Sequence, residues 1–199
     1  MARSTRDLAG LALGVGIFVG TAALARRPIS RTEVQAFRAV NDLPGAGFPV
    51  IWLPMQYGTF GTVPVSAMLA LARNRPRLAL AIGIGGTAAW VSAKALKRCI
   101  GRGRPAIVID GVLLRGVEEG DLGFPSGHAA VSAALTVVAL PSVTGGWPLA
   151  LAALSGFVPL ARMYVGAHLP LDVVGGSALG LAIGSAVNLL IPVSRIEPS

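Results

Sequence analysis

The stretch Phe124-Pro125-Ser126-Gly127-His128-Ala129-Ala130-Val131 opens the apolar run that decides the fold. From Leu122 to Ala161, His128 is the only titratable residue, and turn-forming residues between Pro141 and Pro148 divide the run in two. Uncharged helices of about 20 residues are long enough to cross a bilayer. The sequence therefore predicts two antiparallel membrane helices, near residues 126–143 and 147–165.

The entry to the first of these helices predicts an anion site. A helix N-terminus carries unpaired backbone N–H groups and the positive end of the helix dipole. Gly127 lets a ligand approach the backbone closely, and Ser126 adds a hydroxyl. His128 adds a group that exchanges a proton near neutral pH.

Composition favours a membrane protein with one domain, residues 1–199. Of the 199 residues, 53% are hydrophobic and only 13% are charged, which is far more apolar than an ordinary soluble domain. The formal charge of +8 is spread between long uncharged runs, so there is no contiguous basic face for a nucleic acid. Lipid headgroups or phosphate esters are the better partners. The single cysteine, Cys99, allows no disulfide within the chain.

Four further crossings are predicted over residues 8–25, 49–72, 78–95 and 173–193, which makes an all-α bundle of about six membrane helices. A signal peptide ending at Ala23-Leu24-Ala25 competes for the first, but the apolar run is long for one. We expect a kink near Pro64 in the second. Small residues at intervals of four predict close helix packing, at Gly10/Gly14, Gly16/Gly20 and Gly176/Gly180/Gly184.

Two polar segments connect these helices. Residues 29–42 have apolar residues at helical spacing, which is typical of a surface helix that either covers a site or connects two spans, and we favour a connector. Residues 97–122 form the most polar loop of the chain, which we interpret as solvated rather than as a headgroup site. The roles of its charged residues stay open: Arg115, Glu118, Glu119 and Asp121.

The predicted spans place three charged stretches on one membrane face. These are Lys97-x6-Arg104-Pro105, Pro125-Ser126-Gly127-His128 and Arg162-x5-His168-x3-Asp172, which contain both histidines of the chain. Ionisable groups at membrane depth are costly and tend to mark function. We therefore expect the two histidines to meet around one phosphate. The count of basic residues does not decide which face this is, because several of them are the proposed phosphate ligands.

These three motifs, in this order and spacing, resemble the signature of the type 2 phosphatidic acid phosphatase superfamily. The motifs span residues 97–172, and the six-helix layout resembles the membrane branch of that family. The resemblance implies a phosphatase that acts on a lipid phosphate or diphosphate without a metal. Candidate substrates are a polyprenyl diphosphate, phosphatidic acid and phosphatidylglycerol phosphate.

The resemblance also implies a role for each residue. His168 is the nucleophile that forms a phosphohistidine, Asp172 orients it, and His128 is the general acid and base. Phosphoryl transfer needs fixed cations and N–H donors around the equatorial oxygens. Five residues are expected to supply them: Lys97, Arg104, Ser126, Gly127 and Arg162.

One position departs from the family pattern. Ala161 precedes Arg162 where the family commonly has serine, so a hydroxyl that could contact the phosphate is missing. No carboxylates are spaced as metal ligands with the histidines, and we expect no cofactor and inhibition by vanadate. We expect a multi-pass protein of the bacterial cytoplasmic membrane, with its site on the extracytoplasmic face and an oligomeric state that the sequence leaves open. Three alternatives remain: a lipid phosphotransferase with the same site, a haloperoxidase and a non-catalytic lipid carrier.

Overall fold

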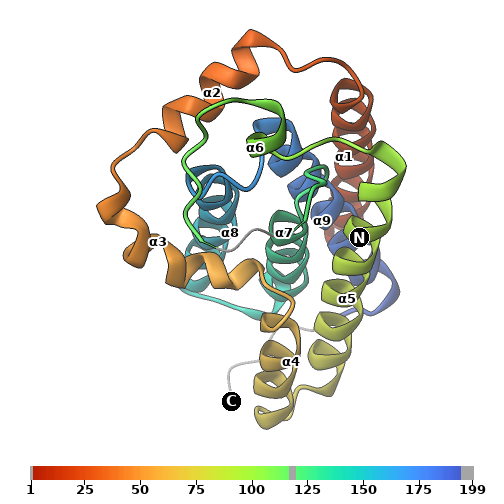
Figure 1. Ribbon diagram of the computed structural model, residues 1–199. Coiled ribbons are helices and arrows are strands. Elements are labelled where there is room, and N and C mark those ends of the chain that lie inside the picture. Colours follow the sequence, from red (N-terminus) through yellow and green to blue (C-terminus); the bar gives the residue numbers. More distant parts are fainter. Residues whose placement is uncertain (1, 117–119, 194–199) are drawn as a thin grey trace.

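The computed structural model describes residues 2–116 and 120–193, and these residues form a helical bundle (Figure 1). Apart from an isolated bridge between Gly103 and Leu122, the regular elements of the described residues are helical, as the all-α prediction requires. The α-helices are α1 (Ala2–Ala25), α2 (Arg31–Asn41), α3 (Phe48–Met55), α4 (Thr62–Ala72), α5 (Pro76–Ile100), α6 (Pro105–Val108), α7 (Gly127–Ala139), α8 (Trp147–Tyr164) and α9 (Pro170–Leu190). Three 3-10 turns join them at Gly45–Gly47, Gln56–Gly58 and Leu140–Ser142.

Three segments are long and apolar enough to cross a membrane: Ser4–Ala25, Pro76–Ile100 and Pro170–Leu190. Two shorter apolar helices, Thr62–Ala72 and Gly127–Ser142, accompany them. The described residues therefore form a multi-pass bundle with three clear membrane spans by length and composition.

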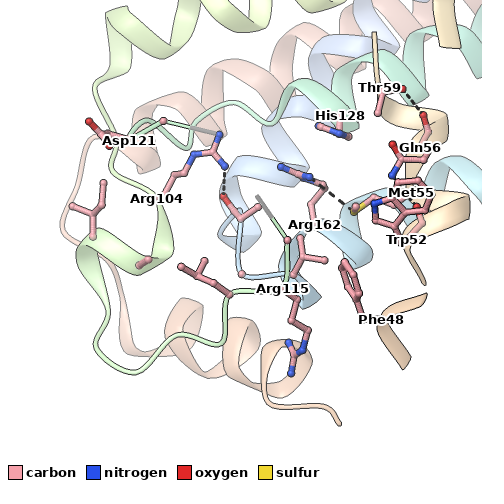
Figure 2. A pocket seen from close by; sticks show the side chains of 18 residues that line it. Phe48, Trp52, Met55, Gln56, Thr59, Arg104, Arg115, Asp121, His128 and Arg162 are labelled. Atoms are coloured by element: carbon pink, nitrogen blue, oxygen red, sulfur yellow. Dashed lines mark hydrogen bonds between the residues drawn. The ribbon is translucent and has the colours of Figure 1, made fainter. Parts of the chain in front are cut away.

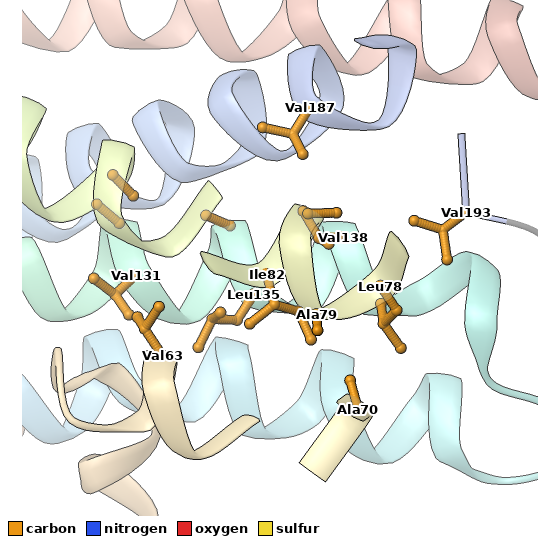
Figure 3. Packing of buried hydrophobic residues seen from close by; sticks show 14 of the residues in the cluster. Val63, Ala70, Leu78, Ala79, Ile82, Val131, Leu135, Val138, Val187 and Val193 are labelled. Atoms are coloured by element: carbon orange, nitrogen blue, oxygen red, sulfur yellow. The ribbon is translucent and has the colours of Figure 1, made fainter. Parts of the chain in front are cut away.

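Helix α7 lies at the centre of the bundle, against α5, α8 and α9 (Figure 1). Its contact with α9 depends on glycines, because a Cβ at Gly176 or Gly180 would lie 2.3 or 2.2 Å from the backbone oxygen of Ser126 or Ala130. The main apolar core lies between α5, α7 and α9, where Ile82, Leu135 and Val187 are buried (Figure 3). The predicted close packing along Gly176, Gly180 and Gly184 is confirmed.

Helix α1 packs on α9 through only one of its two predicted glycine pairs. A Cβ at Gly14 would lie 2.7 Å from the backbone nitrogen of Ala182, and one at Gly10 would meet Ser185. Nothing lies within 4 Å of a Cβ at Gly16 or Gly20, so the packing prediction is wrong for that pair. The reason is geometric: at 3.6 residues per turn, positions two apart face opposite sides of a helix.

The second predicted crossing is broken, and not where we expected. Pro64 lies in the first turn of α4, where a missing N–H does no harm, so it produces no kink. The chain instead breaks between Met55 and Thr62, where the Thr62 hydroxyl donates to the Gln56 carbonyl at 2.8 Å. A Cβ at Gly58 would lie 2.6 Å from the backbone oxygen of His128. The break therefore sits where the chain passes closest to the start of α7.

Candidate active site

Backbone hydrogen bonds join the first motif to the residues just before the second motif. The Arg104 N–H donates to the Asp121 carbonyl at 2.9 Å, and the Gly123 N–H donates to the Arg102 carbonyl at 2.7 Å. Lys97, near the end of α5, donates through Nζ to the carbonyls of Leu122 and Gly123 at 2.7 and 2.8 Å. The last residues of the polar loop, just before α7, therefore lie against its first residues.

The third motif reaches the same place through a tight turn after α8. Gly166 has a φ of +80°, and a Cβ there would lie 2.7 Å from the Leu113 carbonyl oxygen, so this position requires glycine. The turn brings the Ala167 carbonyl within 3.3 Å of Arg104 Nη1. The Ser126 N–H donates to the Asp172 carbonyl at 2.9 Å, which ties the second motif to the third.

The two histidines line one cavity of about 450 Å³, together with Lys97, Arg104 and Gly127. A second cavity of about 250 Å³ adjoins it, because Arg104 and His128 line both. Arg162 lines the second cavity, and Figure 2 shows its guanidinium directed into the space between Arg104 and His128. We call Lys97, Arg104, His128, Arg162 and His168 the cradle. The two histidines meet as the sequence predicts.

Ser126 has a structural partner in this arrangement. It is fully buried, and its hydroxyl accepts a hydrogen bond from the Ala129 N–H at 3.5 Å as the N-cap of α7. It lies next to Gly127, which does line the cavity. Its role as a phosphate ligand stays a prediction.

His168 and Asp172 are adjacent but do not form a short hydrogen bond. His168 Nδ1 lies 3.6 Å from Asp172 Oδ2 and has no hydrogen-bond partner within the described ranges. Asp172 Oδ2 accepts the Leu169 N–H at 2.9 Å, and Oδ1 accepts Arg102 Nη1 at 3.1 Å. Asp172 thus caps α9, as its place in the first turn allows, and faces the imidazole.

The surroundings of His168 keep its imidazole neutral. The residue is 1% exposed, and burial lowers its pKa well below the usual 6.5, with further lowering by the positive charges of Lys97, Arg162 and Arg104 and by His128. Nδ1 faces Asp172, so Nε2 is the ring nitrogen that does not face this carboxylate.

Two residues that the sequence did not identify hold Asp172 in place. Arg102 donates to Asp172 on one side and to Glu33 of α2 on the other, with Nη2 to Oε2 at 2.5 Å. Glu33 Oε1 accepts the Leu171 N–H at 3.1 Å. We call Glu33, Arg102 and Asp172 the ion-pair cluster; all three are buried. Helix α2 therefore does more than connect two spans, which corrects our interpretation of it as a connector.

Helix α2 is also fixed to the polar loop by Asn41. This buried amide donates to the carbonyls of Leu113 and Tyr164 at 3.0 and 3.1 Å and accepts the Leu113 N–H at 3.0 Å. Arg115 extends the connection, since it donates to the Asn41 and Leu43 carbonyls at 2.8 and 2.7 Å. Of the other loop residues, Asp121 lines the smaller cavity, and Glu118 and Glu119 lie outside the described residues.

The smaller cavity has one apolar wall. Phe48, Trp52 and Met55 of α3 form this wall, and Met55 Sδ lies 3.9 Å from Arg162 Nη1 (Figure 2). Ala161 is buried on the same side, in a cluster with Met55 and Val165. The residue that replaces the usual serine therefore packs against apolar side chains.

The described residues contain no group of three or more His, Cys, Asp or Glu that could hold a metal ion. Independence from metals stays a prediction that a chelator can test.

Comparison with known proteins gives concordant results. The profile of the PAP2 superfamily matches residues 75–195, which include all three motifs. An undecaprenyl-diphosphatase of Sulfolobus acidocaldarius is 30% identical over 172 residues, covering 83% of this chain and 82% of the relative.

Two crystal structures share the fold. LpxE of Aquifex aeolicus has a TM-score of 0.65 at 22% identity and covers 77% of this chain and 93% of its own. A PAP2-type phosphatidylglycerolphosphate phosphatase of Bacillus subtilis has a TM-score of 0.66 at 21% identity and covers 88% of this chain and 94% of its own.

Proposed function

Because the chain belongs to the PAP2 superfamily and is a phosphatase of that family, we propose that it hydrolyses a lipid diphosphate of the polyprenyl type. The observation that supports this most is the position of the cradle. Three cations and two imidazoles from distant segments surround the junction of two cavities, and apolar side chains line both cavities beside these charged groups. A charged headgroup joined to an apolar chain matches that junction.

The proposed reaction has two steps. Neutral His168 attacks the terminal phosphorus through Nε2, the bond to the bridging oxygen breaks, and His128 donates a proton to that oxygen. His128 then takes a proton from water, which attacks the phosphohistidine and releases inorganic phosphate and His168. Lys97, Arg104, Arg162 and the Gly127 N–H hold the equatorial oxygens in both steps.

The side on which the leaving group lies follows from the lining of the two cavities. His168 lines the larger cavity but not the smaller one, and His128 lines both. An in-line displacement puts the leaving group opposite the nucleophile. We therefore infer that the lipid monophosphate product leaves past Met55 and Trp52 of α3.

We infer that the bundle crosses the membrane six times, through α1, the α3–α4 pair, α5, α7, α8 and α9, with the cradle on the extracytoplasmic face. Cys99 is exposed and lies two residues from Lys97, so it reports on that face. A maleimide that cannot cross membranes should label Cys99 in intact cells. Asn74→Cys in a Cys99→Ala background, at the other end of α5, should be labelled only after permeabilisation, and the reverse pattern would invert the orientation.

The function is tested by phosphate release from purified undecaprenyl diphosphate, phosphatidic acid and phosphatidylglycerol phosphate, with His168→Ala beside the wild type. We expect the diphosphate to be the best substrate and the variant to release no phosphate above background. A better rate with either monophosphate would move the assignment to that lipid. Near-normal release by the variant would refute the proposed nucleophile.

The same assay separates the remaining alternatives. Activity should persist in a chelator and stop with vanadate. Phosphorylation of an added alcohol in place of phosphate release would identify a phosphotransferase. Lipid movement between leaflets without phosphate release would identify a carrier.

A further inference from the structure

A second group of cations lies at the end of the bundle opposite the cradle. On α5, Arg77 stands near the start of the helix and Lys97 near its end. At 1.5 Å per residue these positions are about 30 Å apart, which is about the thickness of the hydrocarbon core. The apolar core lies between them, with Val63 and Val131 at one end and Leu78 and Val193 at the other (Figure 3).

The other helices place the same two groups at opposite ends. His128 begins α7, and Ser142 ends the 3-10 turn that follows it. Trp147 begins α8, and Arg162 lies in its last turn. The cations around Arg77 therefore face the opposite side of the membrane from the cradle.

These cations line an open cavity of about 880 Å³. A tight turn between α4 and α5 presents them, in which Asn74 has a φ of +54° and the Arg75 N–H donates to the Ala70 carbonyl at 2.9 Å. Arg73 and Arg77 are exposed, while Arg75 donates through Nη1 to the Ser142 carbonyl at 3.0 Å. The cavity is lined by Arg73, Arg75, Arg77, Ser142, Trp147 and Val193, among others.

Two further features of this cavity favour an anion. The N-termini of α5 and α8 both begin beside it, at Arg75 and Gly146, and neither is capped by a side chain. Independently, Ser142 lines the cavity and is 1% exposed, and its buried hydroxyl has no hydrogen-bond partner in the part of the chain that the structure describes. A buried hydroxyl without a partner is costly, and a ligand oxygen would satisfy it.

We propose that this cavity binds the phosphodiester headgroup of an anionic membrane phospholipid. The source is a lipid because the cavity lies at the ends of membrane helices and holds Trp147, which is 68% exposed at the start of α8. Tryptophan prefers the headgroup level of a bilayer. The apolar side chains of Leu151 and Val193 line the same cavity and suit the beginning of an acyl chain. Arginines between membrane helices recognise such headgroups.

The test measures binding of dioleoylphosphatidylglycerol to the full chain in detergent by native mass spectrometry, with dioleoylphosphatidylcholine as the neutral lipid. The Arg73→Gln/Arg77→Gln variant should bind phosphatidylglycerol roughly 25-fold more weakly, at about fivefold for each arginine. Arg26→Gln/Arg27→Gln removes the same charge from two exposed arginines after α1 and should bind like the wild type. Ser142→Ala should weaken binding without changing the charge.

Four results would overturn the proposal. Equal loss in the Arg26→Gln/Arg27→Gln variant would show attraction by net charge alone. Equal loss in Arg162→Gln would place the lipid in the cradle. Competition by millimolar inorganic phosphate, or tighter binding by a chain that ends at Val193, would show that a soluble anion or residues 194–199 occupy the cavity.

Discussion

The cradle and the ion-pair cluster are both buried and charged, but their charges are arranged in opposite ways. The cradle sets three cations around two histidines and faces the cavities. In the ion-pair cluster, one guanidinium lies between the carboxylates of Glu33 and Asp172 and touches both. An anion can reach the cradle's cations through the cavities, while the guanidinium of the cluster lies between two carboxylates. The cradle is therefore suited to bind an anion, and the ion-pair cluster is suited to position Asp172.

The strongest test of this comparison removes the guanidinium from the cluster. Arg102→Ala leaves two buried carboxylates without the cation that pairs with both, which should lower the free energy of unfolding by about 3–5 kcal/mol. Denaturant unfolding in mixed micelles measures this loss, and Arg98→Ala on the exposed side of α5 is the matched control. Arg102→Lys should lower the free energy of unfolding less than Arg102→Ala does. A loss no greater than in the control would mean that the cluster does not stabilise the fold.

The corresponding change in the cradle should affect activity more than stability. Arg162→Gln removes a cation that would hold the transferred phosphoryl group, so kcat/KM should fall by about 100-fold to 1,000-fold. The free energy of unfolding should change less than in Arg102→Ala, because Arg162 lines a cavity and Arg102 lies between two buried carboxylates. Phosphate release and denaturant unfolding on the same preparations decide this. If Arg162→Gln and Arg102→Ala lowered the free energy of unfolding by similar amounts, the cradle and the ion-pair cluster would not differ in their contribution to stability.

The same distinction explains what the sequence could predict. Lys97, Arg104, His128, Arg162 and His168 lie in motifs with fixed spacing, and the predicted spans were enough to put those motifs on one face. Glu33 belongs to no such motif. It lies on the polar side of an amphipathic helix, where a carboxylate is usually solvated, and only the fold brings it to Arg102.

The sequence did not predict that α3 lines a cavity, and the reason is different. Its apolar residues between two prolines were predicted as part of a membrane span, and apolar composition does not separate a lipid-facing residue from one that lines a cavity. The break after Met55 depends on the contact of Gly58 with α7, which is 70 residues away in the chain. Contacts at that separation leave no local pattern.

A smaller effect is expected from a substitution in the turn after α8, which places His168 in the cradle. Gly166→Ala forces a side chain into the left-handed region and against the Leu113 carbonyl, which should cost about 1–3 kcal/mol of unfolding free energy. Gly16→Ala is the matched control, because nothing lies within 4 Å of a Cβ there. It should be neutral or slightly stabilising, since alanine favours a helix interior. If Gly166→Ala left the free energy of unfolding unchanged, the turn would be able to adjust its backbone to a side chain at this position.

The smallest effect concerns pH and follows from the burial of His168 next to the positive charges of the cradle. His168 has its pKa lowered in the folded protein, by burial first and then by Lys97, Arg162, Arg104 and His128, whereas the unfolded chain has the usual 6.5. Below pH 6.5 the unfolded state therefore binds a proton that the folded state does not, and stability falls as pH falls; above it, neither state binds one. The slope is at most about 1.4 kcal/mol per pH unit. Unfolding curves of the wild type and His168→Gln between pH 8 and 5 isolate this contribution, because His128 and Asp172 are present in both proteins. Parallel curves would mean that His168 takes up a proton in the folded state as easily as in the unfolded chain, and then the cradle would not hold a neutral nucleophile ready for an incoming anion.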